Sequence, residues 1–343
     1  MIAESLQREI DVGSFPAAAW AVGTLDGIVG EGALGHAVAV PLRIPATVDT
    51  IFDVASLTKP LITATLILQA VADSAIALDD RFEGFTYRSL LTHSSGLIAW
   101  LPLYAFPDPL QAIHDHGRGA AGTVYSDLNF ILLWYALQRL YGDYVARARQ
   151  RILDPLGVDA LFRPPAALKP RIAATEWGQR WEMRMCAERK IAFDGFRQSL
   201  IWGETHDGNS HHLGGTAGNA GLFATARAVF RIAQAFACGE LVPPALVAQA
   251  TRDHGNHRGL GWDKPTPGSL ATSMLSKEAY GHTGFTGTSV WVDGDRIFVL
   301  LTNRVHPVAA ANALQRIRGE FHGLALSQFP RPARAGRGWP KAG

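Results

Sequence analysis

The sequence predicts an α+β protein in which helices flank an antiparallel β-sheet and a mainly helical lobe is inserted into the chain. Segments near both ends are apolar or alternate as strands do, and turn residues such as Asp26-Gly27 and Asp293-Gly294 separate them. Residues 81–217 instead show long helical patterns interrupted by Pro and Gly. With 343 residues, 48% of them hydrophobic, the chain can bury one large core or two closely packed lobes.

The N-terminal part is predicted to contain a helix, a hairpin and a short strand. Ile2, Leu6 and Ile10 recur between charged residues, which is typical of an amphipathic helix. Residues 15–22 and 28–40 are the predicted hairpin strands, and residues 50–54 are a strand. A long apolar stretch with helical character follows and ends near residue 72.

The rest of the chain supplies the inserted lobe and the second half of the sheet. The clearest helical pattern of the lobe is Asp127–Tyr141, and a glycine-rich passage at 213–223 leads into a helix over 226–238. Strands are predicted at 259–262, 287–293 and 296–302, before a closing helix over 309–321. The predicted division is a sheet domain from 1–80 and 218–329, a helical lobe at 81–217, and a flexible tail at 330–343.

Charge, cysteine content and the N-terminal segment argue against several classes of protein. A formal net charge of +2 does not indicate a nucleic-acid partner. Cys186 and Cys238 form no spaced motif, so we expect free thiols and neither a disulfide framework nor a zinc site. The first helix is not a signal-peptide core, so we expect a cytoplasmic protein with no membrane span, either a monomer or a small homo-oligomer. No cofactor is expected.

Ser56 and Lys59 are the first candidate catalytic pair. On a helix, residues i and i+3 share one face, so the hydroxyl and the amine are expected to touch. A serine becomes a good nucleophile when a base takes its proton, and burial of an amine lowers its pKa toward the range where it can do so. Pro60 favours a helix start here, which places Ser56 at a helix N-terminus. The alternative is a surface serine beside an extended lysine.

Tyr125 is the candidate partner acid or base. It precedes Ser126 and Asp127 at the start of the clearest helix of the lobe. A phenolate beside Lys59 would be stabilised by the ammonium and could relay the proton of Ser56 to a leaving group. The alternative is a half-buried tyrosine followed by an aspartate that caps the helix.

His282, Thr283 and Gly284 end a predicted strand and form a candidate substrate-binding motif. Glycine allows close approach of substrate to the backbone, and the N–H groups of Phe285 and Ser56 could form an oxyanion hole. His282 would add a titratable positive charge, or it is an ordinary strand-end histidine.

Residues 205–212, with the sequence THDGNSHH, raise the question of a metal site. The donors are crowded on a polar segment and lack the H-E-x-x-H spacing, so no metal is predicted. We expect this segment to be a loop at the rim of the cleft.

The motifs together resemble one known family. In chain order SLTK, LLTHSSGL, YSD, GNAGLFATA, GLGW and HTG are similar to motifs of the serine β-lactamase and penicillin-binding protein superfamily, in particular its class C-like branch. The resemblance covers about residues 15–305 and implies a β-lactamase/transpeptidase-like fold. It implies that Ser56 is the acylated nucleophile, Lys59 its proton acceptor and Tyr125 the partner acid/base. Residues 282–284 match the third motif of the family, usually K-T-G, on the strand that lines the cleft.

The chain departs from the family pattern at two positions. Asp127 replaces an asparagine whose amide binds the substrate's acylamide and the lysine, and an ionised carboxylate cannot donate a hydrogen bond. Asp127 could instead pair with Lys59, keep the lysine charged, and make Tyr125 the better candidate for the base. His282 replaces lysine and is a weaker anchor for a substrate carboxylate at neutral pH. Both departures weaken the case for a β-lactamase.

The leading functional hypothesis is a serine hydrolase that cleaves an ester or amide through an acyl-enzyme, most simply a β-lactamase-related esterase. The alternatives are a D-alanyl-D-alanine carboxypeptidase, a D-amino-acid amidase or a weak β-lactamase, so the expected partner is a small-molecule ester, amide or β-lactam. A non-catalytic, peptide-binding or self-assembling homologue is the alternative from another class. Trp100 and Tyr104 either shape the acyl pocket or serve packing. An α/β-hydrolase would need a G-x-S-x-G motif, which the chain lacks.

Overall fold

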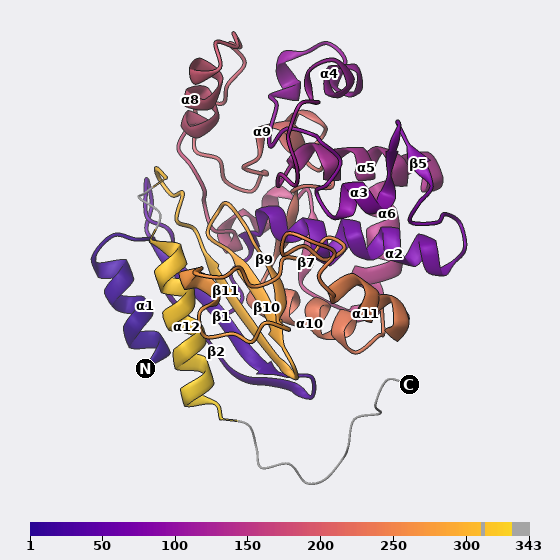
Figure 1. Ribbon diagram of the computed structural model, residues 1–343. Coiled ribbons are helices and arrows are strands. Elements are labelled where there is room, and N and C mark those ends of the chain that lie inside the picture. The colour runs from indigo at the N-terminus through magenta and orange to yellow at the C-terminus, as the bar shows by residue number, and fades with distance from the viewer. Residues whose placement is uncertain (310–312, 331–343) are drawn as a thin grey trace.

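The computed structural model describes residues 1–309 and 313–330, and its centre is a six-stranded antiparallel sheet in the order β3-β2-β1-β11-β10-β9 (Figure 1). The strands are β1 (Ala17–Thr24), β2 (Gly27–Val38), β3 (Ile44–Pro45), β9 (Tyr280–Thr283), β10 (Ser289–Asp293) and β11 (Arg296–Thr302). β1 pairs with β2 on one side and with β11 on the other, so the two ends of the chain share one sheet. The predicted α+β fold and both predicted hairpins are confirmed.

Both faces of this sheet are buried, which explains why β1 is apolar at nearly every position. Ala18 and Trp20 point into a core with helices α1 (Ile2–Asp11) and α12 (Leu314–Gln328). Ala19 and Ala21 point to the opposite face, into the main core with α10 (Ala226–Ala237). Successive side chains of a strand alternate between faces, so a strand buried on both sides loses the polar half of its pattern. Figure 1 shows α1 and α12 together on one side of the sheet.

The remaining elements build the part of the molecule beside the sheet. A three-stranded sheet has the order β4-β8-β7, and β5 and β6 form a small hairpin. The helices and strands are β4 (Phe52–Asp53), α2 (Thr65–Ala72), β5 (Arg81–Phe82), β6 (Phe85–Thr86), α3 (Tyr87–Leu91), α4 (Pro109–His116), α5 (Asp127–Tyr141), α6 (Tyr144–Ala148), α7 (Asp154–Leu156), β7 (Ala160–Phe162), α8 (Arg180–Glu188), α9 (Gly208–His212), β8 (Leu222–Ala224) and α11 (Pro244–Thr251). The main hydrophobic core runs through both this part and the sheet. The division into two domains therefore stays a prediction.

The helix after β4 is less regular than the sequence predicts. It begins with a 3₁₀ turn at Ala55–Leu57, continues as a π-helical turn at Lys59–Ala64, and becomes α-helical only at α2. Pro60 has no N–H group, so the regular hydrogen-bond ladder cannot run through it. The hydroxyl of Thr65 donates to the Pro60 carbonyl at 2.9 Å. Residues 55–72 are apolar and long enough to cross a bilayer, but 83% of this stretch is buried in the fold, as in the core helix of a globular protein.

Three predictions about elements need correction or fall outside the structure. Residues 259–262 are not a strand, because Gly261 has a φ of +83° and the chain turns between isolated bridges at Arg258 and Asp263. The closing helix is α12, which starts five residues later than expected, at Leu314, and ends at Gln328. The predicted flexible tail, apart from Pro330, lies outside the described residues. The helices predicted at 127–141 and 226–238 are confirmed within one residue.

Candidate active site

Ser56 lies in a tight turn directly after β4, and the residue before it is strained. Ala55 has a φ of +49°, a left-handed conformation that costs a non-glycine residue about 1–3 kcal/mol. The buried carboxyl of Asp53 holds this turn. Its Oδ1 accepts a hydrogen bond from the Ala55 N–H at 2.9 Å, and its Oδ2 accepts one from the His206 N–H at 2.7 Å. The Asp53 side chain therefore fixes the backbone around Ser56, and no sequence motif pointed to this role of Asp53.

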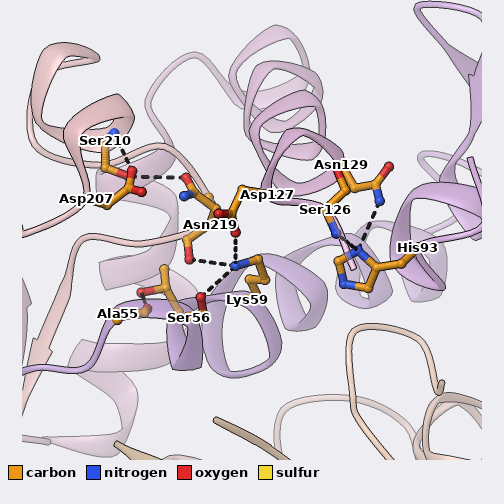
Figure 2. Close-up of polar contacts among 12 residues, drawn as sticks. Ala55, Ser56, Lys59, His93, Ser126, Asp127, Asn129, Asp207, Ser210 and Asn219 are labelled. Atoms are coloured by element: carbon orange, nitrogen blue, oxygen red, sulfur yellow. Dashed lines mark hydrogen bonds and ion pairs between the residues drawn. The ribbon is translucent and has the colours of Figure 1, made fainter. Parts of the chain in front are cut away.

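Lys59 is fully buried and contacts Ser56, as the spacing predicted. Its Nζ lies 2.8 Å from Ser56 Oγ, 2.6 Å from Asp127 Oδ1 and 3.3 Å from the Asn219 carbonyl oxygen (Figure 2). An ammonium has three N–H donors, and here three acceptors surround it. The site is therefore built for the charged form of the lysine.

The expectation that burial gives Lys59 a low pKa is wrong. Burial alone would lower that pKa, but the charge of Asp127, with smaller contributions from Tyr125, raises it above its ordinary value. Burial also raises the pKa of the Asp127 carboxyl, while the Lys59 ammonium opposes that rise. We assign the pair as ammonium and carboxylate, because the Asn219 carbonyl and Ser56 hydroxyl add acceptors for Lys59.

Tyr125 reaches the same centre from the N-terminal end of α5. Its ring centroid lies 4.9 Å from Lys59 Nζ, and it lines both cavities that Ser56 lines. Burial raises the pKa of the phenol, and the neighbouring Lys59 ammonium opposes that rise. His93 fixes this loop, because its Nδ1 accepts hydrogen bonds from the Ser126 N–H and the Asn129 amide, each at 3.0 Å. His93 belongs to the LLTHSSGL motif, so this motif positions the loop that carries Tyr125.

The HTG motif lies on β9 beside the turn of Ser56. His282 is buried, and burial together with the nearby Lys59 and Arg258 cations lowers the pKa of its imidazole well below the ordinary value. The expected positive charge on His282 is therefore wrong at neutral pH. Gly284 packs directly on the nucleophile turn, because a Cβ there would lie 2.6 Å from the Val54 carbonyl oxygen. Thr283 and Gly284 line a cavity that reaches Ser56.

Two cavities meet at Ser56 and Phe285. The first has a volume of about 190 Å³ and is lined by aromatic and acidic side chains together with Ser56 and Asn219, including Trp100, Tyr125, Asp127, Trp181, Glu182, Asp207 and Phe285. The second, of about 300 Å³, is lined by Ser56, Tyr125, Arg258, His282, Arg304 and Arg318 among others. Trp100 lines the first cavity as predicted. Tyr104 is not among the lining residues and packs on Phe193 and His212.

The segment at 205–212 is more ordered than the predicted rim loop. Asp207 caps the short helix α9 by accepting the Ser210 N–H at 2.7 Å, and His206 contacts Glu176 at 3.1 Å. Among the described residues no group of three or more His, Cys, Asp or Glu side chains could hold a metal ion. His206 and Asp207 line the first cavity, which agrees with the predicted place of this segment beside the cleft. Their position depends in part on the hydrogen bond from the His206 N–H to Asp53, 153 residues away in the chain.

The structure brings together Ser56 on a strained turn, Lys59 beside it, and Tyr125. This is the arrangement that the sequence resemblance implied. A family model described as Beta-lactamase matches residues 3–320. The chain belongs to the beta-lactamase family. Membership in this family, together with the sequence relatives, identifies the chain as a serine hydrolase.

Proteins that resemble this beta-lactamase-family chain in sequence or in fold are described in different terms. A putative D-alanyl-D-alanine carboxypeptidase of Escherichia coli (strain K12) is 29% identical over 322 residues, which covers 78% of this chain and 72% of the relative. A penicillin-binding protein homologue from Caulobacter crescentus has the same fold, with a TM-score of 0.70 at 19% identity, covering 95% of this chain and 96% of that one. EstCE1, a hydrolase with promiscuous acyltransferase activity, has a TM-score of 0.69 at 16% identity, covering 94% and 97%.

Proposed function

We propose that the chain is a β-lactamase-related esterase that cleaves a small ester or amide through an acyl group on Ser56. The observation that supports this most is the contact of Ser56 Oγ with Lys59 Nζ at 2.8 Å, at the junction of two cavities. A hydroxyl so placed can attack a carbonyl carbon bound across the junction, and water then hydrolyses the ester that forms. The N–H groups of Ser56 and Phe285 are the proposed oxyanion hole, each worth about 3 kcal/mol in the transition state.

Tyr125 is the proposed acceptor of the serine proton. Lys59 is held as an ammonium by Asp127, so it donates to Ser56 Oγ and does not accept from it. Tyr125 lines both cavities together with Ser56, so the Ser56 hydroxyl can donate to its oxygen when Tyr125 is a phenolate. Because the pKa of Tyr125 is raised, the phenolate forms only after the phenol has lost its proton to solvent at higher pH. The phenolate then takes the proton of Ser56 as Ser56 Oγ attacks the carbonyl carbon, and Tyr125 returns that proton to the leaving group.

A D-alanyl-D-alanine carboxypeptidase is the second candidate. It is supported by the similarity to a putative D-alanyl-D-alanine carboxypeptidase of Escherichia coli and by the arginine side chains in the second cavity, which suit a substrate carboxylate. The replacement of a lysine by a neutral His282 and of an asparagine by Asp127 favours the esterase over a β-lactamase.

Pre-steady-state hydrolysis of p-nitrophenyl acetate tests the proposal. We expect a burst of p-nitrophenol equal to the enzyme concentration, because acylation of Ser56 releases the phenol before deacylation. Ser56→Ala should abolish the burst, whereas Ser94→Ala, an exposed serine outside both cavities, should retain it. A burst of undiminished size in Ser56→Ala would refute the proposal.

A further inference from the structure

The two cavities at Ser56 carry opposite charge. In the first cavity, here called the acidic cavity, the cation of Lys59 is already paired with Asp127, which leaves Asp207 and Glu182. Glu182 is buried and accepts the Gly208 N–H at 2.7 Å and the Gln179 amide at 2.8 Å, and no cation contacts it among the described residues. Burial, and after it the charge of Asp207, raises the pKa of Glu182. The carboxyl groups of Glu182 and Asp207 therefore face the same cavity and interact electrostatically with each other.

The aromatic walls of the acidic cavity already interact with arginines of the protein. Arg189, Arg184 and Arg304 lie 5.1, 4.3 and 4.6 Å from the ring centroids of Trp100, Trp181 and Phe285. Attraction of a ligand cation in this cavity is therefore assigned to the carboxyl groups of Asp207 and Glu182. Figure 2 shows Asp207 and Asp127 on either side of Asn219, above the turn that holds Ser56.

The second cavity, here called the arginine cavity, is lined by arginines that are not all paired with a carboxylate among the described residues. Arg258 is paired with Asp263, but Arg304 and Arg318 contact no carboxylate in the part of the chain that the structure describes. Both are buried, with 6% and 5% exposure. Residues 310–312 and 331–343 contain no Asp or Glu that could supply a partner. Buried cations without a counter-ion are unfavourable, so a bound anion would relieve the site.

Unpartnered polar atoms point to the same conclusion. Arg318 Nη2 donates to the Thr288 carbonyl at 2.9 Å, but its Nε has no hydrogen-bond partner among the described residues. His282 Nε2 is likewise buried and unpartnered there. Buried polar atoms are nearly always hydrogen-bonded, so these atoms indicate a group that binds in the cavity.

We propose that the substrate is a small zwitterion, with an ammonium group in the acidic cavity, a carboxylate in the arginine cavity, and the scissile ester or amide between them at Ser56. A dipeptide with both termini free, or the corresponding ester, has this chemistry, whereas an N-acylated peptide lacks the cation. This inference rests on the proposed hydrolysis at Ser56. The volumes of about 190 and 300 Å³ suit single small residues on each side.

Calorimetric binding of a matched set of dipeptides to the Ser56→Ala variant tests the inference without any turnover. The set is D-alanyl-D-alanine, its N-acetyl derivative, its C-terminal amide and the doubly blocked compound, with the L series measured in parallel. We expect the zwitterion of at least one series to bind about tenfold more tightly than either singly blocked compound. Equal or tighter binding of the acetylated or the amidated compound in both series would overturn the inference.

Second-site variants in the same background separate the two cavities. Asp207→Asn keeps the helix cap and should remove the preference for the free amine while keeping the preference for the carboxylate. Arg304→Gln should do the reverse, and Arg304→Lys, which keeps the charge, should restore the carboxylate preference. Asp143→Asn, which caps α6 outside both cavities, should change neither. If Asp207→Asn and Arg304→Gln alter the same preference, or neither, the assignment of charge to the cavities is wrong.

The failure of this inference and that of the proposed function are distinguishable. Absence of a burst at Ser56 would refute the acyl-enzyme and leave the binding ratios unaffected. Absence of the binding preferences would refute the zwitterion and leave the acyl-enzyme intact.

Discussion

The Nζ of Lys59 lies 2.6 Å from Oδ1 of Asp127, so the lysine beside the proposed nucleophile is already paired with a carboxylate. An asparagine at position 127, as in the resembled family, would accept a hydrogen bond without fixing a proton on the lysine. The pair keeps a proton on Lys59, so under the proposed function Tyr125 is the group that accepts the proton of Ser56.

Asp127→Asn should shift the rising limb of the pH–kcat/KM profile to lower pH. Asp127 raises the pKa of both Lys59 and Tyr125, and whichever group is the base must lose its proton before it can act. Removal of the charge lowers both pKa values, so the base is free at lower pH. The profile is measured with p-nitrophenyl acetate between pH 5 and pH 10 on both proteins, with spontaneous hydrolysis subtracted. If the rising limb lies at the same pH in both proteins, the Lys59–Asp127 pair does not control the pKa of the base.

Lys59→Ala should lower the free energy of unfolding by about 1–3 kcal/mol at neutral pH, because it leaves the half-buried Asp127 carboxylate without its partner. Adding Asp127→Asn to Lys59→Ala should restore part of this loss, since the unpaired charge is then gone. Urea unfolding of the two single variants and the double variant gives the coupling energy. Additive effects would mean that the contact contributes little to stability.

Tyr125→Phe should lower kcat/KM by about 10²–10⁴-fold, the usual contribution of a general acid/base. The ring contacts with His93 and His282 remain in the variant, so its melting temperature should change little. Tyr135→Phe, a half-buried tyrosine of α5 outside both cavities, is the matched control. A mild effect of Tyr125→Phe on the rate would assign the tyrosine to packing.

Gly284→Ala should lower both stability and activity. The new methyl group would lie 2.1 Å from Thr288 Oγ1 and 2.6 Å from the Val54 carbonyl oxygen, so β9 or the turn of Ser56 must move. Gly323→Ala is the control, because its methyl group finds space next to Met274 inside α12. That change should stabilise the protein by about 0.5–1 kcal/mol. Thermal unfolding and ester hydrolysis of both variants provide the comparison, and a neutral Gly284→Ala would refute the close packing.

The fold was largely predictable because its elements have local causes. Turn residues mark both hairpins, apolar strands reflect a sheet buried on both faces, and the 127–141 helix carries a long uninterrupted pattern. The irregular turns at 55–64 depend on Pro60 and on side-chain hydrogen bonds that a helical pattern does not reveal. The absent strand at 259–262 depends on a positive φ at Gly261.

The part of the candidate site that sequence motifs supply was predictable, and the remaining residues of the site were not. Ser56, Lys59, Tyr125, Asp127 and the HTG motif meet as the resemblance implied. The ammonium form of Lys59 agrees with the alternative drawn from Asp127 at the departure from the family pattern. The neutral form of His282 was not predictable, because it depends on burial and on the Lys59 and Arg258 cations far away in the chain. Asp207, Arg304 and Arg318 lie in no motif, and only the packing of α9, α12 and the end of β11 brings them to the cavities.

Mass spectrometry after reaction with a fluorophosphonate tests the central claim most directly, because the reagent bonds covalently to an activated serine. The account predicts one adduct per chain, located on the peptide that contains Ser56, and no adduct on Ser56→Ala. An adduct on another serine, or none on a folded chain that still hydrolyses esters, would contradict it.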